Sequence, residues 1–378
     1  MEVQDTYNAA YIVHFLLGAG NLVPWNSFIT AVDYFEYLYS GKHVDKVFSV
    51  AYMAASWLVL VTLMCLSSRS KLPGFKVRMN LGLGLFIIAL MIAPVKDWIS
   101  PNRKPEIAYV VLGLALVICG VADGLTMGSL VGATGELPGR YMQAVFAGNA
   151  SSVISRLGIL VCILRIVTKA TLPHTPKGLH VSTQIYFMIS TLTIILFILC
   201  CNLLEMLPII QFFNRAPQSN CANQAAKNVL KRIRCPAFTM LIIYIVTLSI
   251  FLEYLSENVK SRYFRDWYPV LLISTYNVPK FLEKILDATY ITKKTNSLTW
   301  AGMTRISFYV LFVACVRGPK WFRTELPVVF LTTVLGTTNG YLTNLVPVEE
   351  LETVGIVMSL FLMTGLAMGS LLGWLWNI

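Results

Sequence analysis

VFSVAYMAASWLVLVTLMCL, residues 47–66, is an apolar run without a single charged side chain. A helix needs about 20 mostly apolar residues to cross the hydrocarbon core of a bilayer, and this run has that length. The stretch from Val354 to Ile378 is also free of charge. Two such runs, far apart in the chain, predict helices that span a membrane.

The composition of the whole chain indicates the same class of protein. Of its 378 residues, 56% are hydrophobic and 13% are charged, and the mean hydropathy is +0.66. A soluble domain is nearer a quarter charged, so this composition excludes a soluble fold. The formal net charge of +11 is carried in short gaps between apolar runs. Basic residues in such gaps fix topology and contact anionic headgroups, so we expect a lipid bilayer as partner and no nucleic acid.

Reading the chain for further apolar runs predicts an all-α polytopic protein with about eleven spans. The predicted spans are 9–36, 47–66, 79–98, 107–134, 141–168, 183–205, 237–256, 267–291, 298–316, 325–346 and 354–377. The longest gap, 207–236, is polar and basic. Because secondary carriers are often built from two helical bundles, we predict a six-helix bundle over 1–206, a cytoplasmic loop over 207–236 and a five-helix bundle over 237–378.

Two loops hold the densest basic clusters, and they predict the orientation in the membrane. One is the loop between the second and third spans, with Arg69, Lys71, Lys76 and Arg78, and the other is the 207–236 loop. An even number of predicted spans separates them, so they share a side. Basic loops favour the cytoplasm, which predicts a cytoplasmic N-terminus and an external C-terminus.

Glycines recur at every fourth position in two of the predicted spans. They are Gly120, Gly124, Gly128 and Gly132 in one span, and Gly365, Gly369 and Gly373 in the last. Small residues at this spacing let helix backbones approach closely in lipid. We interpret both stripes as packing surfaces rather than as ligand contacts.

Charged groups inside a span are costly, so they are functional candidates. Asp123 lies deep in the fourth span, and we expect it to face the interior of a bundle. The alternative is a structural ion pair or hydrogen bond between helices, for which Arg156 and Arg305 are possible partners. Both readings stay open from the sequence alone.

The first span contains a helix breaker beside an aromatic residue. Pro24 removes a backbone donor and frees an earlier carbonyl, and broken helices often line a substrate path. Trp25 and Asn26 follow at once. An aromatic face and an amide suit a flat heterocycle that forms hydrogen bonds, although a proline kink with a nearby tryptophan is also a common packing feature.

Four blocks of this sequence, in order, resemble the equilibrative nucleoside transporter family. Their residues are most similar to those of plant members. The blocks are GAGNLVPWNSFITAVDYF (18–35), GVADGLTMGSLVGATGELPGRYMQAVFAG (120–148), DWYPVLLISTYNV (266–278) and RGPKWFRTELPVVFLTTVLGTTNGYLTNLVP (317–347). The resemblance implies eleven helices in a six-plus-five arrangement related to the major-facilitator fold. It also implies a cytoplasmic N-terminus and purine and pyrimidine nucleosides as substrates.

The resemblance also implies substrate-binding residues, position by position. Leu22, Trp25 and Asn26 match the first-helix motif that lines the central cavity of the family and meets the base. Asn149 stands near the substrate, where other members have a glutamine or a threonine. Asn277 matches a family asparagine in the eighth helix.

The eighth helix then departs from the family pattern. The family aspartate is replaced by Lys280 and the glycine by Glu283, while the basic residue survives as Lys284. Span five departs as well, with an unexpected arginine at position 156. At 100° per residue, Asn277, Lys280, Glu283, Lys284 and Asp287 fall within an arc of about 120°. This face should line the cavity or a helix seam, where Lys280 and Lys284 are expected to contact substrate.

These observations favour a nucleoside carrier that works by alternating access without covalent chemistry. Transport is either facilitated or proton-coupled; Asp123, Glu283, Asp287 and Arg305 are the candidates for coupling or gating. One alternative is a transport-impaired paralogue with a binding or regulatory role, and another is a carrier of a different purine-like solute. No catalytic constellation, metal-ligand spacing or cofactor motif is visible, so we expect no enzyme, no metal and no cofactor. The sequence leaves the plasma membrane and the vacuolar membrane open.

Overall fold

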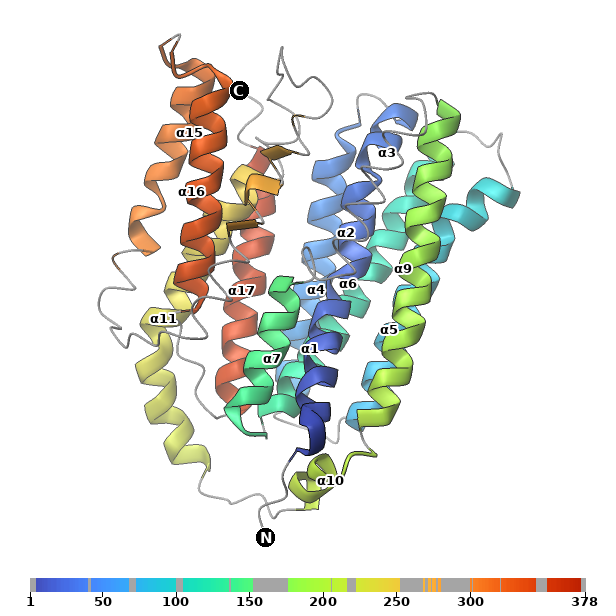
Figure 1. Cartoon of the computed structure of the whole chain (residues 1–378), viewed down its shortest axis with the longest axis vertical. Coiled ribbons are helices and arrows are strands. Elements are labelled where there is room, and N and C mark those ends of the chain that lie inside the picture. Colours follow the sequence, from blue (N-terminus) through green and yellow to red (C-terminus); the bar gives the residue numbers. More distant parts are fainter. Residues whose placement is uncertain are drawn as a thin grey trace. The chain divides into compact units, whose positions relative to one another are not determined.

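The computed structural model is all-helical in the residues that it describes (Figure 1). These are residues 5–39, 42–67, 73–99, 105–135, 137–151, 176–204, 206–215, 222–251, 268, 271–272, 274–276, 278–279, 300, 302–319, 321–344 and 352–374. The chain divides into two compact units. The first comprises Met1–Ala226 and Val348–Ile356, and the second comprises Lys227–Pro347 and Val357–Ile378.

Most of the first unit is a bundle of long helices. Its elements are η1 (Thr6–Asn8), α1 (Ala9–Asn21), α2 (Val23–Thr30), α3 (Val32–Leu38), α4 (Val44–Ser67), α5 (Phe75–Ile99), α6 (Pro105–Gly135), α7 (Gly139–Ser151), α9 (Pro176–Leu204) and α10 (Pro208–Arg215). Helix α6 packs against both α4 and α5, while α1 packs against α7 and α9. The first predicted span is therefore three consecutive helices, α1, α2 and α3, rather than one.

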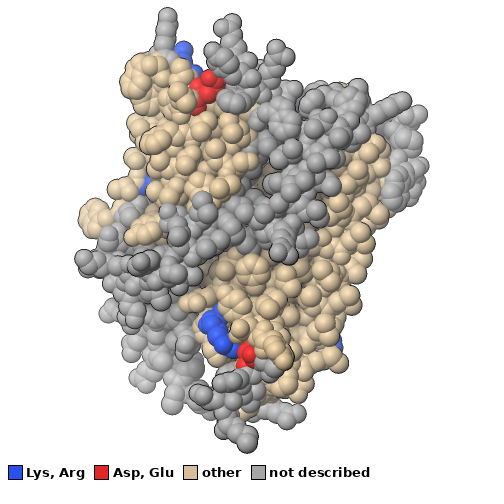
Figure 2. Space-filling model, in the orientation of Figure 1, with Lys and Arg blue, Asp and Glu red and all other residues tan. Residues whose placement is uncertain are grey.

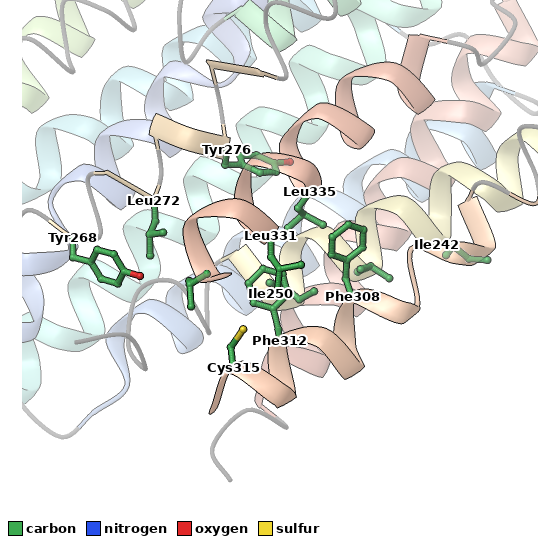
Figure 3. Packing of buried hydrophobic residues seen from close by; sticks show 12 residues of the cluster. Ile242, Ile250, Tyr268, Leu272, Tyr276, Phe308, Phe312, Cys315, Leu331 and Leu335 are labelled. Atoms are coloured by element: carbon green, nitrogen blue, oxygen red, sulfur yellow. The ribbon is translucent and has the colours of Figure 1, made fainter. Parts of the chain in front are cut away.

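The second unit holds most of α11 (Ala222–Phe251) and α17 (Glu352–Gly373), together with α15 (Ser307–Arg317) and α16 (Glu325–Asn344). Its apolar core joins α11, α15 and α16 to the segment around Tyr268, Leu272 and Tyr276 (Figure 3). Phe312 and Leu335 lie fully buried in this cluster. These contacts hold the second unit together from within.

Five of the described helical stretches are long and apolar enough to cross a membrane: Ala9–Ile29, Lys46–Leu63, Phe75–Val95, Glu106–Gly135 and His180–Leu204. Their outward faces carry exposed apolar side chains. On α9, for example, Leu192, Leu196 and Leu199 are exposed while Phe187 and Phe197 are fully buried. On the face shown in Figure 2, the described surface is almost entirely uncharged. Such a surface suits lipid, in which exposed leucine has no cost.

The segment 207–236 differs from the loop that the sequence predicts. It contains α10, and α11 already begins at Ala222, before the apolar run starts. The physical reason lies in helix propensity, because alanine, lysine, arginine and leucine all favour helix in water. Hydropathy detects only the part of a helix that suits lipid. The predicted span therefore begins at residue 237, whereas α11 begins at Ala222 with polar turns.

Five glycines of the two stripes lie at helix crossings, which confirms the packing interpretation for these positions: Gly120, Gly124, Gly128, Gly365 and Gly369. A Cβ on Gly124 would lie 2.6 Å from the backbone oxygen of Ser56 on α4, and Gly120 meets the backbone of Tyr52 on the same helix. In the second unit, Gly365 and Gly369 meet α11 in the same way. Each close approach leaves no room for a side chain.

Candidate functional site

The break between α1 and α2 lies where Pro24 predicts it. Helix α1 ends at Asn21 and α2 begins at Val23, with Leu22 between them. Proline has no backbone N–H, so Pro24 donates no proton to the carbonyl of Gly20, four residues earlier. That carbonyl accepts from the N–H of Leu22 instead. The chain resumes its helical bonds when the N–H of Asn26 donates to Leu22 at 3.0 Å. The break positions three side chains of the predicted motif: Leu22, Trp25 and Asn26.

Trp25 packs against an aromatic residue of α4. Its ring stacks on Tyr52 with a centroid separation of 4.5 Å and an interplanar angle of 28°. Trp25 is 9% exposed and Tyr52 is 1% exposed. One face of the indole is therefore covered by protein, and a base that stacks on Trp25 has to use the other face or the ring edge.

Asp123 on α6 is bound by polar side chains from two other helices. The amide Nδ2 of Asn21, the last residue of α1, donates to Asp123 Oδ1 at 2.6 Å. The hydroxyl of Ser56 on α4 donates to Asp123 Oδ2 at 2.6 Å. The far end of the Asn21 amide meets the hydroxyl of Thr126, one turn further along α6. All four residues are buried.

Tyr52 joins the aromatic pair to this polar network. It lies beside the carboxylate of Asp123 and stacks on Trp25. Its hydroxyl makes no hydrogen bond of good geometry with any described residue. We call the set Asn21, Trp25, Tyr52, Ser56, Asp123 and Thr126 the break cluster. It ties α1, α2, α4 and α6 together at the point where the first span is interrupted.

The other predicted site residues of the first unit are placed as follows. Leu22 and Asn26 are half-buried at the break. Asn149 on α7 donates from Nδ2 to the sulfur of Met127 at 3.4 Å. Met127 lies on α6, one turn beyond Asp123. Gly148, the neighbour of Asn149, meets the backbone of Phe15 on α1, so α7 crosses α1 without a side chain between them. Asn277, Lys280, Glu283, Lys284 and Asp287, as well as Arg156, lie outside the described residues.

Arg305 lies in the second unit and is 1% exposed. Its guanidinium donates to the hydroxyls of Thr338 and Thr247, both at 2.9 Å, and to the carbonyl of Leu335 at 3.4 Å. No described carboxylate accepts from it. The printed contacts of Arg305 and of Asp123 each lie within one unit, so the pairing of the two that the sequence suggested stays a prediction.

Four residues of the break cluster were not identified as site residues from the sequence: Asn21, Tyr52, Ser56 and Thr126. A signal for them does exist. Tyr52 and Ser56 are four residues apart on α4, and Asp123 and Thr126 are three apart on α6, so each pair shares one helix face. Polar groups at helical spacing within apolar runs indicate where two spans meet through hydrogen bonds.

The sequence of this chain is similar to that of curated plant proteins over its whole length. It is 48% identical to Equilibrative nucleotide transporter 8 of Arabidopsis thaliana, with 100% of this chain and 97% of that protein covered. It is 38% identical to Equilibrative nucleotide transporter 1 of the same plant, covering 99% of this chain and 87% of that protein.

Among solved structures, the fold is similar to that of major-facilitator transporters. The proton:xylose symporter XylE matches with a TM-score of 0.63 at 13% identity, covering 98% of this chain and 88% of that one. The nucleoside transporter NupG matches with a TM-score of 0.58 at 14% identity, covering 97% of this chain and 90% of that one. At such identities the likeness shows the fold, which is the predicted major-facilitator-like arrangement of helices.

Family membership follows from the sequence itself. Residues 113–227 and 214–378 match the family described as Nucleoside transporter. These two segments overlap and together cover more than half of the chain, including Asp123, Asn149 and Arg305. The protein is an integral membrane protein that belongs to the nucleoside transporter family.

Proposed function

We propose that this protein carries nucleosides across a membrane by alternating access, without covalent chemistry. The observation that carries the proposal is the break cluster. It places an aromatic pair, Trp25 on Tyr52, beside a buried network of amide, hydroxyl and carboxylate groups at an interruption of the first span. A nucleoside has the matching parts, namely a flat base for stacking and hydroxyls for hydrogen bonds.

The charge of the break cluster favours nucleosides over nucleotides, although the plant relatives are named nucleotide transporters. A phosphate carries a charge of about −1.5 to −2 near neutral pH and is bound by arginine or lysine. Asp123 is the one residue of the break cluster with a formal charge, and that charge is negative. In a site of low dielectric constant, a carboxylate repels a phosphate strongly. A neutral nucleoside does not meet this repulsion.

The roles of single residues follow the family resemblance. Trp25 and Leu22 provide apolar contact to the base. Asn26 and Asn149 provide amide groups that form hydrogen bonds with the nucleoside. Asn277, Lys280 and Lys284 would contact substrate from the eighth span, and Glu283, Asp287 and Arg305 would act in gating or coupling. Transport is facilitated or proton-coupled, and the membrane is the plasma membrane or the vacuolar membrane.

Uptake by the full-length protein in liposomes tests this proposal. We expect saturable uptake of labelled uridine and adenosine, and inhibition by unlabelled nucleoside but not by uridine monophosphate at the same concentration. Empty liposomes are the control for leakage. Preferential uptake of the monophosphate would contradict the argument from charge. Folded, correctly inserted protein that takes up neither compound would favour the binding or regulatory alternative.

We also propose that the N-terminus is cytoplasmic and that Ile378 is external. The support is the pair of basic loops, which share one side, and the predicted odd number of spans. A tag after Ile378 should react with an impermeant reagent in intact cells that display the protein at the plasma membrane. Reaction only after permeabilisation would contradict this orientation.

A further inference from the structure

The hydroxyl of Thr126 has more acceptors than it has protons. Its Oγ1 lies 2.9 Å from the carbonyl oxygen of Ala122 and 3.1 Å from that of Asp123, both on its own helix. It also meets the side-chain amide of Asn21. A threonine hydroxyl carries one proton but accepts through two lone pairs. It therefore cannot donate to Asn21 and to Ala122 at once.

Two arrangements of protons fit the same heavy-atom positions. In the first, Thr126 donates to Asn21 Oδ1, and Asn21 Nδ2 donates to Asp123. Asp123 then accepts from both Asn21 and Ser56, as an ionised carboxylate does. The carbonyl of Ala122 receives no proton from Thr126 in this arrangement.

The second arrangement turns the Asn21 amide by half a turn. Asn21 Nδ2 now donates to Thr126, and Thr126 donates to Ala122. Asn21 Oδ1 faces Asp123 Oδ1 at 2.6 Å, so the carboxyl must carry a proton and donate it. That distance suits an O–H···O hydrogen bond, and Ser56 still donates to the other oxygen. The two arrangements differ by one proton on Asp123 and one amide rotation.

We propose that Asp123 is a proton-binding site and that the side-chain amide of Asn21 reverses when the proton binds. The proton comes from water on one side of the membrane and is released to water on the other. No covalent bond other than the O–H bond of the carboxyl forms or breaks. Asn21 is the positioning residue that passes this change to the end of α1.

Among the residues that the structure describes, no cation lies beside the carboxyl group of Asp123. The titratable groups beside it are the phenol of Tyr52 from α4 and the thiol of Cys119, one turn earlier on α6. Helix α1 brings the amide of Asn21, and α5 brings Gly82, which meets Thr126. Neither α5 nor α7 places a described charged side chain against the carboxylate. In the described part of the chain, the carboxyl group is therefore held by hydrogen bonds rather than by an ion pair.

Protonation changes how firmly α1 is tied to α6. A hydrogen bond to an ionised carboxylate is roughly twice as strong as a neutral one. The bond between Asn21 and Asp123 is therefore strong in the ionised state and weaker in the protonated state. Asn21 is the last residue of α1 and lies four residues before Trp25. This last step rests on the proposed function: proton binding loosens the helix break that presents Trp25 to a nucleoside.

Two variants and a matched control test the switch in the liposome assay. Asp123→Asn keeps one donor and one acceptor on the side chain, so it imitates the protonated acid. We expect it to fold, and its uptake, whatever the absolute rate, to lose the severalfold dependence on external pH that the parent shows. Glu106→Gln makes the same change at an exposed position of α6 and should keep the parent's pH dependence. Asn21→Leu removes the transmitting amide and should also lose the pH dependence.

Infrared difference spectra between acidic and alkaline buffer give a second readout that needs no substrate. The purified parent should show a protonated-carboxyl band at acidic pH that persists in Glu106→Gln and Asn21→Leu and is absent in Asp123→Asn. This result separates the two proposals, because the band is expected even if the protein carries no nucleoside. A parent spectrum without a band that depends on Asp123 would overturn the proton site. A parent band combined with normal pH dependence in Asn21→Leu would overturn the role of the amide.

Discussion

Asp123 and Arg305, two of the buried charged residues that the structure describes, are held in different ways. Asp123 in the first unit accepts from Asn21 and Ser56, which reach it from two other helices. Arg305 in the second unit donates to Thr247 and Thr338. These threonines also donate to carbonyls of their own helices, Thr247 at 2.6 Å and Thr338 at 2.7 Å.

This difference indicates which charged side chain contributes to the stability of the helix bundle, called the framework below. Both ends of the Asn21 amide are paired only while the carboxyl group of Asp123 is present, so removing that group leaves one buried polar atom of Asn21 without a partner. The two threonines keep their helical bonds when Arg305 is absent. We infer that Asp123 contributes to both stability and function, whereas Arg305 adds little to stability and is retained for function. Four substitutions test this contrast.

The largest effect is expected for Asp123→Leu. The substitution removes the acceptor of Asn21, and a buried polar group left without a partner costs about 1–3 kcal/mol. Leucine is also larger than aspartate, and overpacking at a close helix crossing costs about 1–3 kcal/mol more. The free energy of unfolding should therefore fall by roughly 2–6 kcal/mol, on the assumption that the two costs add. Thermal unfolding in detergent measures the change. A melting temperature equal to that of the parent would show that Asp123 is not part of the framework.

A smaller loss is expected for Gly124→Ala, which acts on the same network through the backbone. A Cβ there would lie 2.6 Å from the backbone oxygen of Ser56, so α4 must move away and Ser56 loses its contact with Asp123. Overpacking of this kind costs about 1–3 kcal/mol. Gly113→Ala is the matched control on α6, because nothing lies within 4 Å of its Cβ position. The control should be neutral or slightly stabilising, and equal losses in both variants would refute the steric explanation.

The sequence predicted much of the framework and little of the network. Apolar runs located the helices, and the glycine spacing located a face of α6 against which another helix packs, which the structure shows to be α4. The sequence also placed Asp123 in a bundle interior, because a charge in a span has to avoid lipid. It did not reveal Asn21 and Ser56 as the partners. They are 102 and 67 residues from Asp123 in the chain. The polar spacing on α4 and α6 indicates a face that meets another helix, but it does not tell which side chains pair over that separation.

Of the two readings that the sequence left open for Asp123, the described contacts show hydrogen bonds between helices, because neutral amide and hydroxyl donors also bind a carboxylate. Such donors are abundant in any chain, so they stand out only when the fold brings them together. The pairing with Arg305 or Arg156 stays a prediction. The charged face from Asn277 to Asp287 stays a prediction, because it lies outside the described residues.

Trp25→Leu tests the aromatic side of the break cluster. Leucine keeps an apolar side chain at the break and removes the ring that stacks on Tyr52. A lost aromatic contact with the base is worth about 0.5–1.5 kcal/mol, which is roughly a 2- to 13-fold rise in the half-saturation constant for uridine. Trp25→Phe retains a ring and should show a smaller rise. If both variants keep the parent's constant while transporting normally, Trp25 serves packing alone.

The smallest effect on stability is expected for Arg305→Met, which closes the contrast between the two charges. Methionine fills a similar volume without a charge, and replacing a buried ionic group by an apolar one is often neutral or stabilising. Thr247 and Thr338 keep their own helical bonds, so no hydroxyl is stranded. The melting temperature should therefore match or exceed that of the parent, in contrast to Asp123→Leu. Uptake of uridine should nevertheless fall strongly, because a buried cation that no described carboxylate pairs with is costly and is therefore a candidate for a functional role. Arg305→Lys is the control for charge alone, since it keeps the cation but loses the fork of donors that reaches both threonines.

An Arg305→Met variant that is both stable and fully active would assign Arg305 no role in transport. A strongly destabilised variant would place Arg305 in the framework beside Asp123.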